Sequence, residues 1–202
     1  MQVKLYLTDA RSLTGRLVDV MPLLPAKRRN EAEAFVEEKD RLLHCAAGLL
    51  LRCILNVRQD SDLVYGEYDK PELANGQGYF SLSHAGHYAA LAVSDHPVGV
   101  DIEPIVKPQV LPRKMLTLEE MKWLEDHPSP EAFCILWTRL ESALKADGCG
   151  LALEQREFSL LCGGSPWYWD TLIHDGHLLT IAGETPITVE TMVLFAEQLL
   201  KM

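Results

Sequence analysis

Two carboxylates stand two residues apart in the segment Gly99-Val-Asp101-Ile-Glu103. Apolar residues alternate with them as in a strand, so both acidic side chains leave the same face. Neighbouring carboxylates repel each other, and one tends to hold a proton unless a cation lies between them. Hard oxygen ligands of this kind suit Mg²⁺, which binds through a few carboxylates together with phosphate oxygens and water. The alternative is a solvated strand end, and this spacing by itself favours that alternative.

A second group of functional side chains follows at helical spacing. Trp137, Glu141 and Lys145 stand four residues apart, so on a helix they share one face. Glu141 is then placed to complete a metal site with the two acids above, and Lys145 to hold a phosphate as a point charge. The alternative is an ordinary surface Glu–Lys pair, which stabilises a helix by about 0.2–0.5 kcal/mol.

The remaining candidates are cations and hydrogen-bond donors near expected turns. Ser83 and His84 end an expected strand, where the histidine either donates to a phosphate oxygen or caps the turn. Lys70-Pro71 is a turn with a cation, which is commonly just a solvated loop. The densest positive cluster, at residues 27–29, begins with Lys27 and Arg28 and stands near an expected helix start. It is either an anion site or a solvated face.

Hydrophobic periodicity indicates the elements that must position these residues. Helical spacing covers residues 25–56, 116–125 and 130–147, and the last of these ends at a glycine. Strand-like patterns cover residues 1–7, 79–83, 88–94, 97–103, 158–162, 178–182 and 187–195. The class predicted is therefore α+β.

One internal echo indicates two similar halves. The segment His84-Ala-Gly-His87 and the segment His174-Asp-Gly-His177 each precede an apolar strand. Coincidence between two hairpins is the alternative to duplication. We expect a pseudo-dimer of two similar α/β subdomains, residues 1–100 and 101–202, with the active site in the cleft between them, a usual place for a ligand.

Composition limits the partners and the compartment. The 202 residues carry a net charge of −10, which does not favour binding to nucleic-acid phosphates. No apolar run approaches the roughly 20 residues that cross a bilayer, so no membrane association is expected. Five cysteines without a close pair are typical of free thiols in a reducing compartment, which predicts a cytoplasmic protein.

Taken in order, these motifs resemble the 4′-phosphopantetheinyl transferase superfamily, in particular its Sfp-type branch of single chains with two similar halves. Lys70-Pro71 corresponds to the family's Gly-Lys-Pro, and the segment ending at His84 to its Asn-(Leu/Ile)-Ser-His. Residues 99–103 match Gly-(Val/Ile)-Asp-(Val/Ile)-Glu, and residues 137–145 follow the Trp, Glu and Lys spacing. Gly148-Cys-Gly-Leu151 matches the closing Gly-x-Gly-Leu.

Three positions depart from the family pattern. Leu140 stands where the family has a lysine, and an apolar stripe predicts that it packs inward, with Arg139 beside it as a substitute cation. Asp69 replaces the glycine before Lys70. An arginine that the family often has in its first long helix falls on Leu43, with Arg41 and His44 nearby. These changes bear on coenzyme A affinity more than on the chemistry.

The resemblance implies a transferase that moves the phosphopantetheine arm of coenzyme A, a co-substrate, to a serine of an apo acyl or peptidyl carrier protein. It implies Mg²⁺, with Mn²⁺ as the alternative, held by Asp101, Glu103 and Glu141. Catalytic roles fall on Asp101, Glu141 and Lys145, and Glu141 or a water accepts the serine proton. Coenzyme A is expected to contact the residues Lys27, Arg28, Lys70, Pro71, Ser83, His84 and Lys145.

Two other functions remain open at this point: a degenerate relative that binds coenzyme A or a carrier without catalysis, and a metal-dependent nucleotide phosphohydrolase. We expect a monomer, since two halves in one chain need no partner subunit to build the cleft. The carrier and its pathway are not specified by the sequence.

Overall fold

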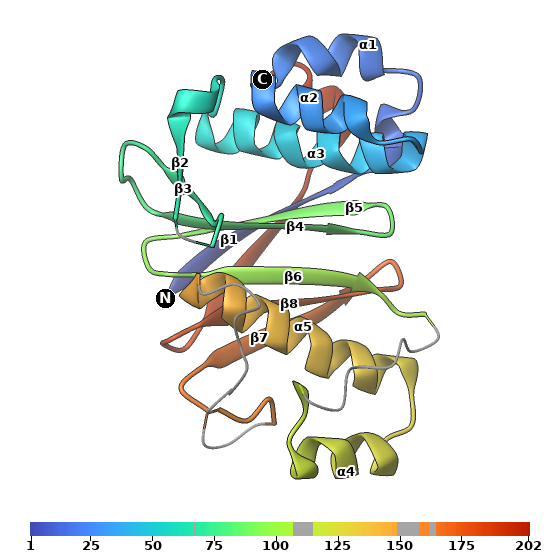
Figure 1. Cartoon of the computed structure of the whole chain (residues 1–202), viewed down its shortest axis with the longest axis vertical. Coiled ribbons are helices and arrows are strands. Elements are labelled where there is room, and N and C mark those ends of the chain that lie inside the picture. The colour runs from blue at the N-terminus through green and yellow to red at the C-terminus, as the bar shows by residue number, and fades with distance from the viewer. Residues whose placement is uncertain (67, 107–114, 149–157, 162–164) are drawn as a thin grey trace.

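The computed structural model describes residues 1–66, 68–106, 115–148, 158–161 and 165–202. Within these ranges the chain forms two β-sheets with helices packed on them, together with a small two-stranded ribbon (Figure 1). The mixed α+β class expected from the sequence is confirmed. None of the helices in the described ranges combines the length and the apolar composition that crossing a bilayer requires.

The elements follow the chain in this order. The helices are α1 (Leu17–Val20), α2 (Ala26–Ala34), α3 (Glu38–Leu55), α4 (Leu118–Asp126), α5 (Pro130–Asp147) and α6 (Ala196–Leu199), with short 3₁₀ segments at Ala10–Leu13, Met21–Leu23 and Asp60–Asp62. The strands are β1 (Gln2–Asp9), β2 (Leu63–Tyr65), β3 (Pro71–Leu73), β4 (Tyr79–Ala85), β5 (Tyr88–Ser94), β6 (Gly99–Pro104), β7 (Tyr168–His174), β8 (His177–Gly183) and β9 (Thr188–Val193).

The first sheet has the strand order β4-β5-β1-β9. β5 pairs antiparallel with β4 and β1, whereas β9 runs parallel to β1. β5 is almost wholly buried, which is why its sequence is a continuous apolar run rather than an alternating one. Helix α3 covers this sheet with α1 and α2 beyond it (Figure 1). It ends at Asn56, whose left-handed backbone (φ 55°) stops the helix.

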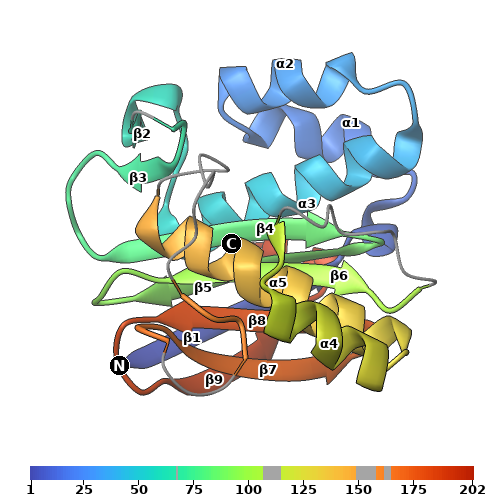
Figure 2. The same ribbon diagram turned by 60° about the horizontal axis from the view of Figure 1, so that its bottom comes forward.

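The second sheet has the order β6-β8-β7 with antiparallel pairs, and every residue of its central strand β8 is buried. Helix α5 packs on β6 and β8, and α4 lies beside it (Figure 2). α5 begins at Ser129, whose hydroxyl accepts the Ala132 amide at 3.1 Å, and ends at Gly148 with φ +85°. The 18-residue helix therefore has the bounds expected from its sequence.

A shared apolar cluster joins the two sheets. Val3, Leu5 and Leu7 of β1 pack in it with Val100 and Ile102 of β6.

The turns of the β4–β5 and β7–β8 hairpins, which resemble each other in sequence, also touch. The rings of His87 and His177 meet edge to face at 4.6 Å. The Tyr88 hydroxyl donates to Asp175 at 3.3 Å.

The C-terminal residues return to the first sheet. β9 forms the outer strand of the first sheet beside β1. α6 packs in the same apolar cluster as α3, on the face of the sheet that α3 covers. These last elements therefore lie with the N-terminal ones, and the expected division near residue 100 stays a prediction.

Two expectations about elements were wrong. The strand expected over 158–162 is absent from its described part, residues 158–161. Side chains hold that backbone instead: the Leu160 amide donates to Glu120 at 2.6 Å, and its carbonyl accepts from Arg139 at 2.8 Å. The helical region 25–56 is divided, since Phe35 has an extended backbone between α2 and α3.

Gly99 permits the close approach of α5 to β6. A Cβ built there lies 1.8 Å from the Ser142 carbonyl oxygen and 2.6 Å from the Ala146 amide nitrogen, both of which are backbone atoms. The helix would have to move away to admit any side chain. Since α5 carries Glu141 and Lys145 while β6 carries Asp101, this glycine determines how near those groups lie.

Gly99→Ala should therefore destabilise the protein by about 3 kcal/mol or more, because overpacking against backbone cannot be relieved by a rotamer change. Urea denaturation monitored by circular dichroism measures the loss. Gly66→Ala is the matched control, because a Cβ there has only the Lys70 carbonyl oxygen near it, at 4.0 Å. Equal stability of the two variants would contradict the argument.

Candidate active site

A pocket of about 450 Å³ opens where β4, β6 and α5 meet. The sequence candidates that line it are Arg28, Pro71, Ser83, His84, Asp101, Glu103, Trp137, Glu141 and Lys145. The three acids expected to hold a metal therefore share one pocket with the lysine expected to hold a phosphate. These residues come from α2, the start of β3, β4, β6 and α5, so the fold brings together groups that are far apart in the chain.

Asp101 is the most tightly held of these groups. Its Oδ1 accepts the Ser83 hydroxyl at 2.8 Å and the Lys145 ammonium at 2.7 Å, and Lys145 also donates to Ser83 Oγ at 3.0 Å. The residue is only 4% exposed. Its other oxygen, Oδ2, is buried and has no hydrogen-bond partner in the described ranges. A buried carboxylate oxygen without a donor is costly, so a ligand is expected there.

Glu103 and Glu141 are perturbed in the same direction. Burial raises the pKa of Glu103, and the nearby charge of Asp101 raises it further, although Trp137 Nε1 donates to its Oε1 at 3.1 Å. Burial and the Asp101 charge also raise the pKa of Glu141, while Lys145 opposes that shift. The three acids thus repel one another within one low-dielectric pocket, an arrangement that a divalent cation would relieve.

The donor chemistry of the site fits such a cation. Asp101 Oδ2 is buried and accepts from no donor in the described ranges. Burial and the Asp101 charge raise the pKa of both glutamates, so they hold protons more readily than usual. Among the residues that the structure describes, no three His, Cys, Asp or Glu side chains are already arranged around an ion position. The Lys145 ammonium supplies part of the positive charge in this arrangement.

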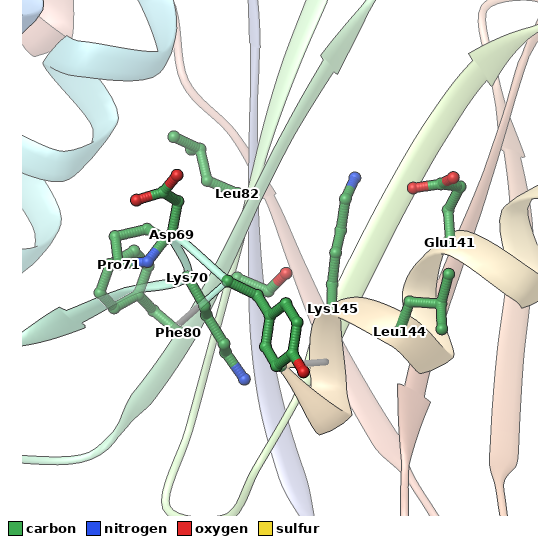
Figure 3. A pocket seen from close by; sticks show the side chains of 11 residues that line it. Asp69, Lys70, Pro71, Phe80, Leu82, Glu141, Leu144 and Lys145 are labelled. Atoms are coloured by element: carbon green, nitrogen blue, oxygen red, sulfur yellow. The ribbon is translucent and has the colours of Figure 1, made fainter. Parts of the chain in front are cut away.

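A second pocket of about 240 Å³ adjoins the first and shares Pro71, Leu82, Glu141 and Lys145 with it. Figure 3 shows Glu141 and Lys145 rising from α5, with Asp69 and Lys70 on the segment opposite. Lys70 Nζ donates to the Ala146 carbonyl at 2.9 Å, near the C-terminal end of α5 where a cation is favourable. Lys70 lines this second pocket and not the larger one.

Arg28 and His84 also line the larger pocket. Arg28 Nη1 is buried without a hydrogen-bond partner in the described ranges. The His84 pKa is lowered by partial removal of the ring from water and by the charges of Arg28 and Lys145. His44 of α3 lies behind, with its ring 6.3 Å from that of His84. Burial lowers the pKa of His44 to about 4, and the Arg28 charge adds to the shift.

The low pKa of His44 predicts acid sensitivity. Between about pH 6.5 and 4 the unfolded state binds a proton at this site more readily than the folded state, so stability falls as the pH falls. His44→Gln cannot titrate and should lose about 2 kcal/mol less than the parent between pH 7 and pH 5. Urea denaturation at both pH values measures this, with the exposed His96→Gln as the control. An unchanged acid loss in His44→Gln would refute the assignment.

Some sequence candidates lie elsewhere. Lys27 lines neither pocket, and its ammonium sits 3.7 Å from the centre of the Tyr65 ring. Leu140 packs inward as expected, at 2% exposure. Arg139, suggested as a substitute cation, also lines neither pocket and instead donates to the Leu160 carbonyl.

The departure at Leu43 and the closing motif can also be located. Leu43 is a core residue, and neighbouring Arg41 donates to the Val36 carbonyl at 2.9 Å. His44 was considered only as a neighbour of Leu43, and its burial against the pocket wall depends on tertiary packing. Residues 149–151 of the closing motif lie outside the described residues.

Comparison with known proteins finds a family match over the segment that carries β6 and α5. Residues 97–177, which contain the Asp101, Glu103, Glu141 and Lys145 positions, match the family model described as the 4′-phosphopantetheinyl transferase superfamily. Over this segment the chain resembles that superfamily. The match begins just before β6 and ends at the start of β8, so it contains most of the second sheet and α5.

Curated superfamily members extend the similarity. The chain is 28% identical to the 4′-phosphopantetheinyl transferase ffp of Bacillus subtilis, over 70% of this chain and 67% of that protein. It is 30% identical to the transferase gsp of Aneurinibacillus migulanus, over 61% and 56%. It is 26% identical to the transferase Sfp of Bacillus subtilis strain 168, over 69% and 67%. The chain thus spans between 56% and 67% of the length of these superfamily relatives.

Proposed function

We propose that this protein transfers the 4′-phosphopantetheine arm of coenzyme A to a serine hydroxyl of an apo acyl or peptidyl carrier protein and releases 3′,5′-ADP. The observation that carries the proposal is the convergence of Asp101, Glu103, Glu141 and Lys145 on one pocket, within the segment that matches the superfamily. Binding without catalysis is disfavoured by the retention of all four groups.

The proposed ligand roles follow from the pocket. Asp101, Glu103 and Glu141 would hold Mg²⁺ or Mn²⁺, which when bound neutralises charge on the phosphoryl oxygens. Lys145, already fixed by Ser83 and Asp101, would contact the same phosphoryl group. We assign coenzyme A contacts to residues of the two adjoining pockets, Arg28, Lys70, Pro71, Ser83, His84 and Lys145. A coenzyme A contact of Lys27 stays a prediction; its ammonium lies over the Tyr65 ring.

In the proposed reaction the carrier serine oxygen attacks the phosphorus that bears the pantetheine arm. A new P–O bond forms to the serine, and the bond to the bridging oxygen of the diphosphate breaks. The electron pair leaves with 3′,5′-ADP. Glu141 is our candidate for the group that takes the serine proton, because its raised pKa makes it a stronger base than an ordinary glutamate.

We further propose a pseudo-dimer of two similar halves, residues 1–100 and 101–202, with this site in the cleft between them. Support comes from the two hairpins that resemble each other and from α3 and α5, each of 18 residues and each packed on its own sheet. We propose that the protein acts as a monomer in the cytoplasm. The free thiols of Cys45, Cys53 and Cys134 are consistent with a reducing compartment.

The test is incubation with coenzyme A, Mg²⁺ and a panel of apo carrier proteins, followed by mass spectrometry of each carrier. We expect one or more carriers to gain the mass of the phosphopantetheine arm. Calorimetric binding of coenzyme A without any such gain would favour a non-catalytic binder. Release of product from coenzyme A without a carrier would favour a phosphohydrolase.

A further inference from the structure

The two sheets face each other through strand edges that do not pair. β4 is the end strand of the first sheet and β6 of the second, and β6 forms its ladder with β8 alone within the described ranges. The two strands nevertheless lie in contact, side by side in Figure 1. Amide groups on the open edge of β6 must therefore find partners other than a neighbouring strand.

Ser81 of β4 provides such a partner. Its Oγ accepts the backbone amide of Val100 at 3.0 Å, across the gap between the sheets. Ser81 is 5% exposed and Val100 is fully buried, so water does not replace this bond readily. A side-chain hydroxyl here does what a main-chain carbonyl does inside a sheet.

A second serine on the same face of β4 hydrogen-bonds to Asp101. Ser81 and Ser83 are two residues apart on the strand, so their side chains leave the same side. Ser83 donates to the Asp101 carboxylate, while Ser81 accepts the amide of Val100, the residue immediately before Asp101. One serine thus holds the backbone from which the carboxylate extends, and the other holds the carboxylate itself.

We propose that Ser81 is a positioning residue for the transfer reaction: its bond to the Val100 amide fixes the Asp101 carboxylate between Ser83 and Lys145. This inference rests on the proposed function. Small displacements of catalytic groups lower rates strongly, with about 1 Å costing up to about 10²-fold, so a bond one residue away from the acid affects turnover.

Ser81→Ala should lower kcat for arm transfer about tenfold or more. Because Ser81 also lines the smaller pocket, KM for coenzyme A is measured beside kcat, and the loss should fall mainly on kcat. Ser94→Ala is the matched control. Ser94 is also buried, at 8% exposure, and its hydroxyl also accepts a backbone amide, that of His96, but it lines neither pocket. Both variants should lose similar thermal stability, and only Ser81→Ala should lose turnover.

Ser81→Thr and Ser81→Val compare the presence and absence of the hydroxyl in β-branched residues, which suit a strand. This pair replaces the alanine variant if that variant does not fold. The threonine variant keeps the hydroxyl and should retain kcat within about threefold, whereas the valine variant should resemble alanine. Equal kcat in these two variants, or kcat in Ser81→Ala equal to that of Ser94→Ala, would overturn the proposal.

Nuclear magnetic resonance separates this inference from the proposed function. In Ser81→Ala the Val100 amide should exchange with solvent about tenfold faster, and the carboxyl carbon shift of Asp101 at pH 7 should change. Ser94→Ala should show neither effect. If the parent protein modifies no carrier, the function fails, while an unaltered Asp101 signal in Ser81→Ala sinks the positioning role in either case.

Discussion

Asp101→Asn is expected to lower arm transfer by at least about 10³-fold. The carboxylate is buried and pairs with Lys145, and its Oδ2, which has no hydrogen-bond partner among the described residues, is where a cation would bind. The amide keeps the shape and one acceptor but removes the negative charge, so metal affinity and the orientation of Lys145 are lost together. Electrostatic groups of this kind commonly contribute several kcal/mol to a transition state.

Mass spectrometry of an apo carrier, sampled over time, measures the effect. Asp95→Asn is the control, since that side chain is 74% exposed in the turn before β6. Thermal unfolding tests whether the fold persists, because removing one partner of a buried ion pair leaves the other charge unpaired and destabilises a protein by about 3–5 kcal/mol. Transfer within tenfold of the parent by a folded Asp101→Asn would remove Asp101 from the site.

Lys145→Met should reduce transfer by about 10²-fold or more and should also move its pH dependence. Lys145 now lowers the pKa of Glu103 and of Glu141, so its removal raises both further. These groups must be ionised to hold a cation or accept a proton. The acid side of the kcat/KM profile should therefore shift to higher pH, and the variant should recover part of its activity above neutrality.

Transfer rates between pH 5.5 and 9 measure this shift, with the exposed Lys122→Met of α4 as the control. Lys145→Arg should lie between parent and Met variant, because it restores the charge but not the compact ammonium geometry. A uniform loss at every pH would show that Lys145 contributes only phosphate binding.

The sequence predicted α5 and β5 well because local signals coincide there. Pro130 and Gly148 bound an apolar stripe, and the turn at Gly86 separates two apolar strands. The strand-like pattern at residues 158–161 failed because side chains of Glu120 and Arg139, distant in sequence, took the backbone bonds.

In the site, too, some residues could be predicted from the sequence and others could not. The motif order led us to expect one site for Asp101, Glu103, Glu141 and Lys145, and all four line the larger pocket. The contact of Ser81 with Val100 depends on how two sheet edges meet, and the destination of the Arg139 side chain depends on Trp169 and Leu160. No periodicity in the chain encodes either arrangement.

The return of β9 to the first sheet has a consequence for how the chain reaches its native state. Gln2 of β1 pairs with Thr188 of β9, so a long stretch of chain separates these two neighbouring strands. During synthesis β1 keeps one edge open until the residues of β9 have been made. Such long-range parallel pairing is slow to form and leaves an aggregation-prone edge meanwhile. Completion of the first sheet therefore follows the synthesis of β9 during folding on the ribosome.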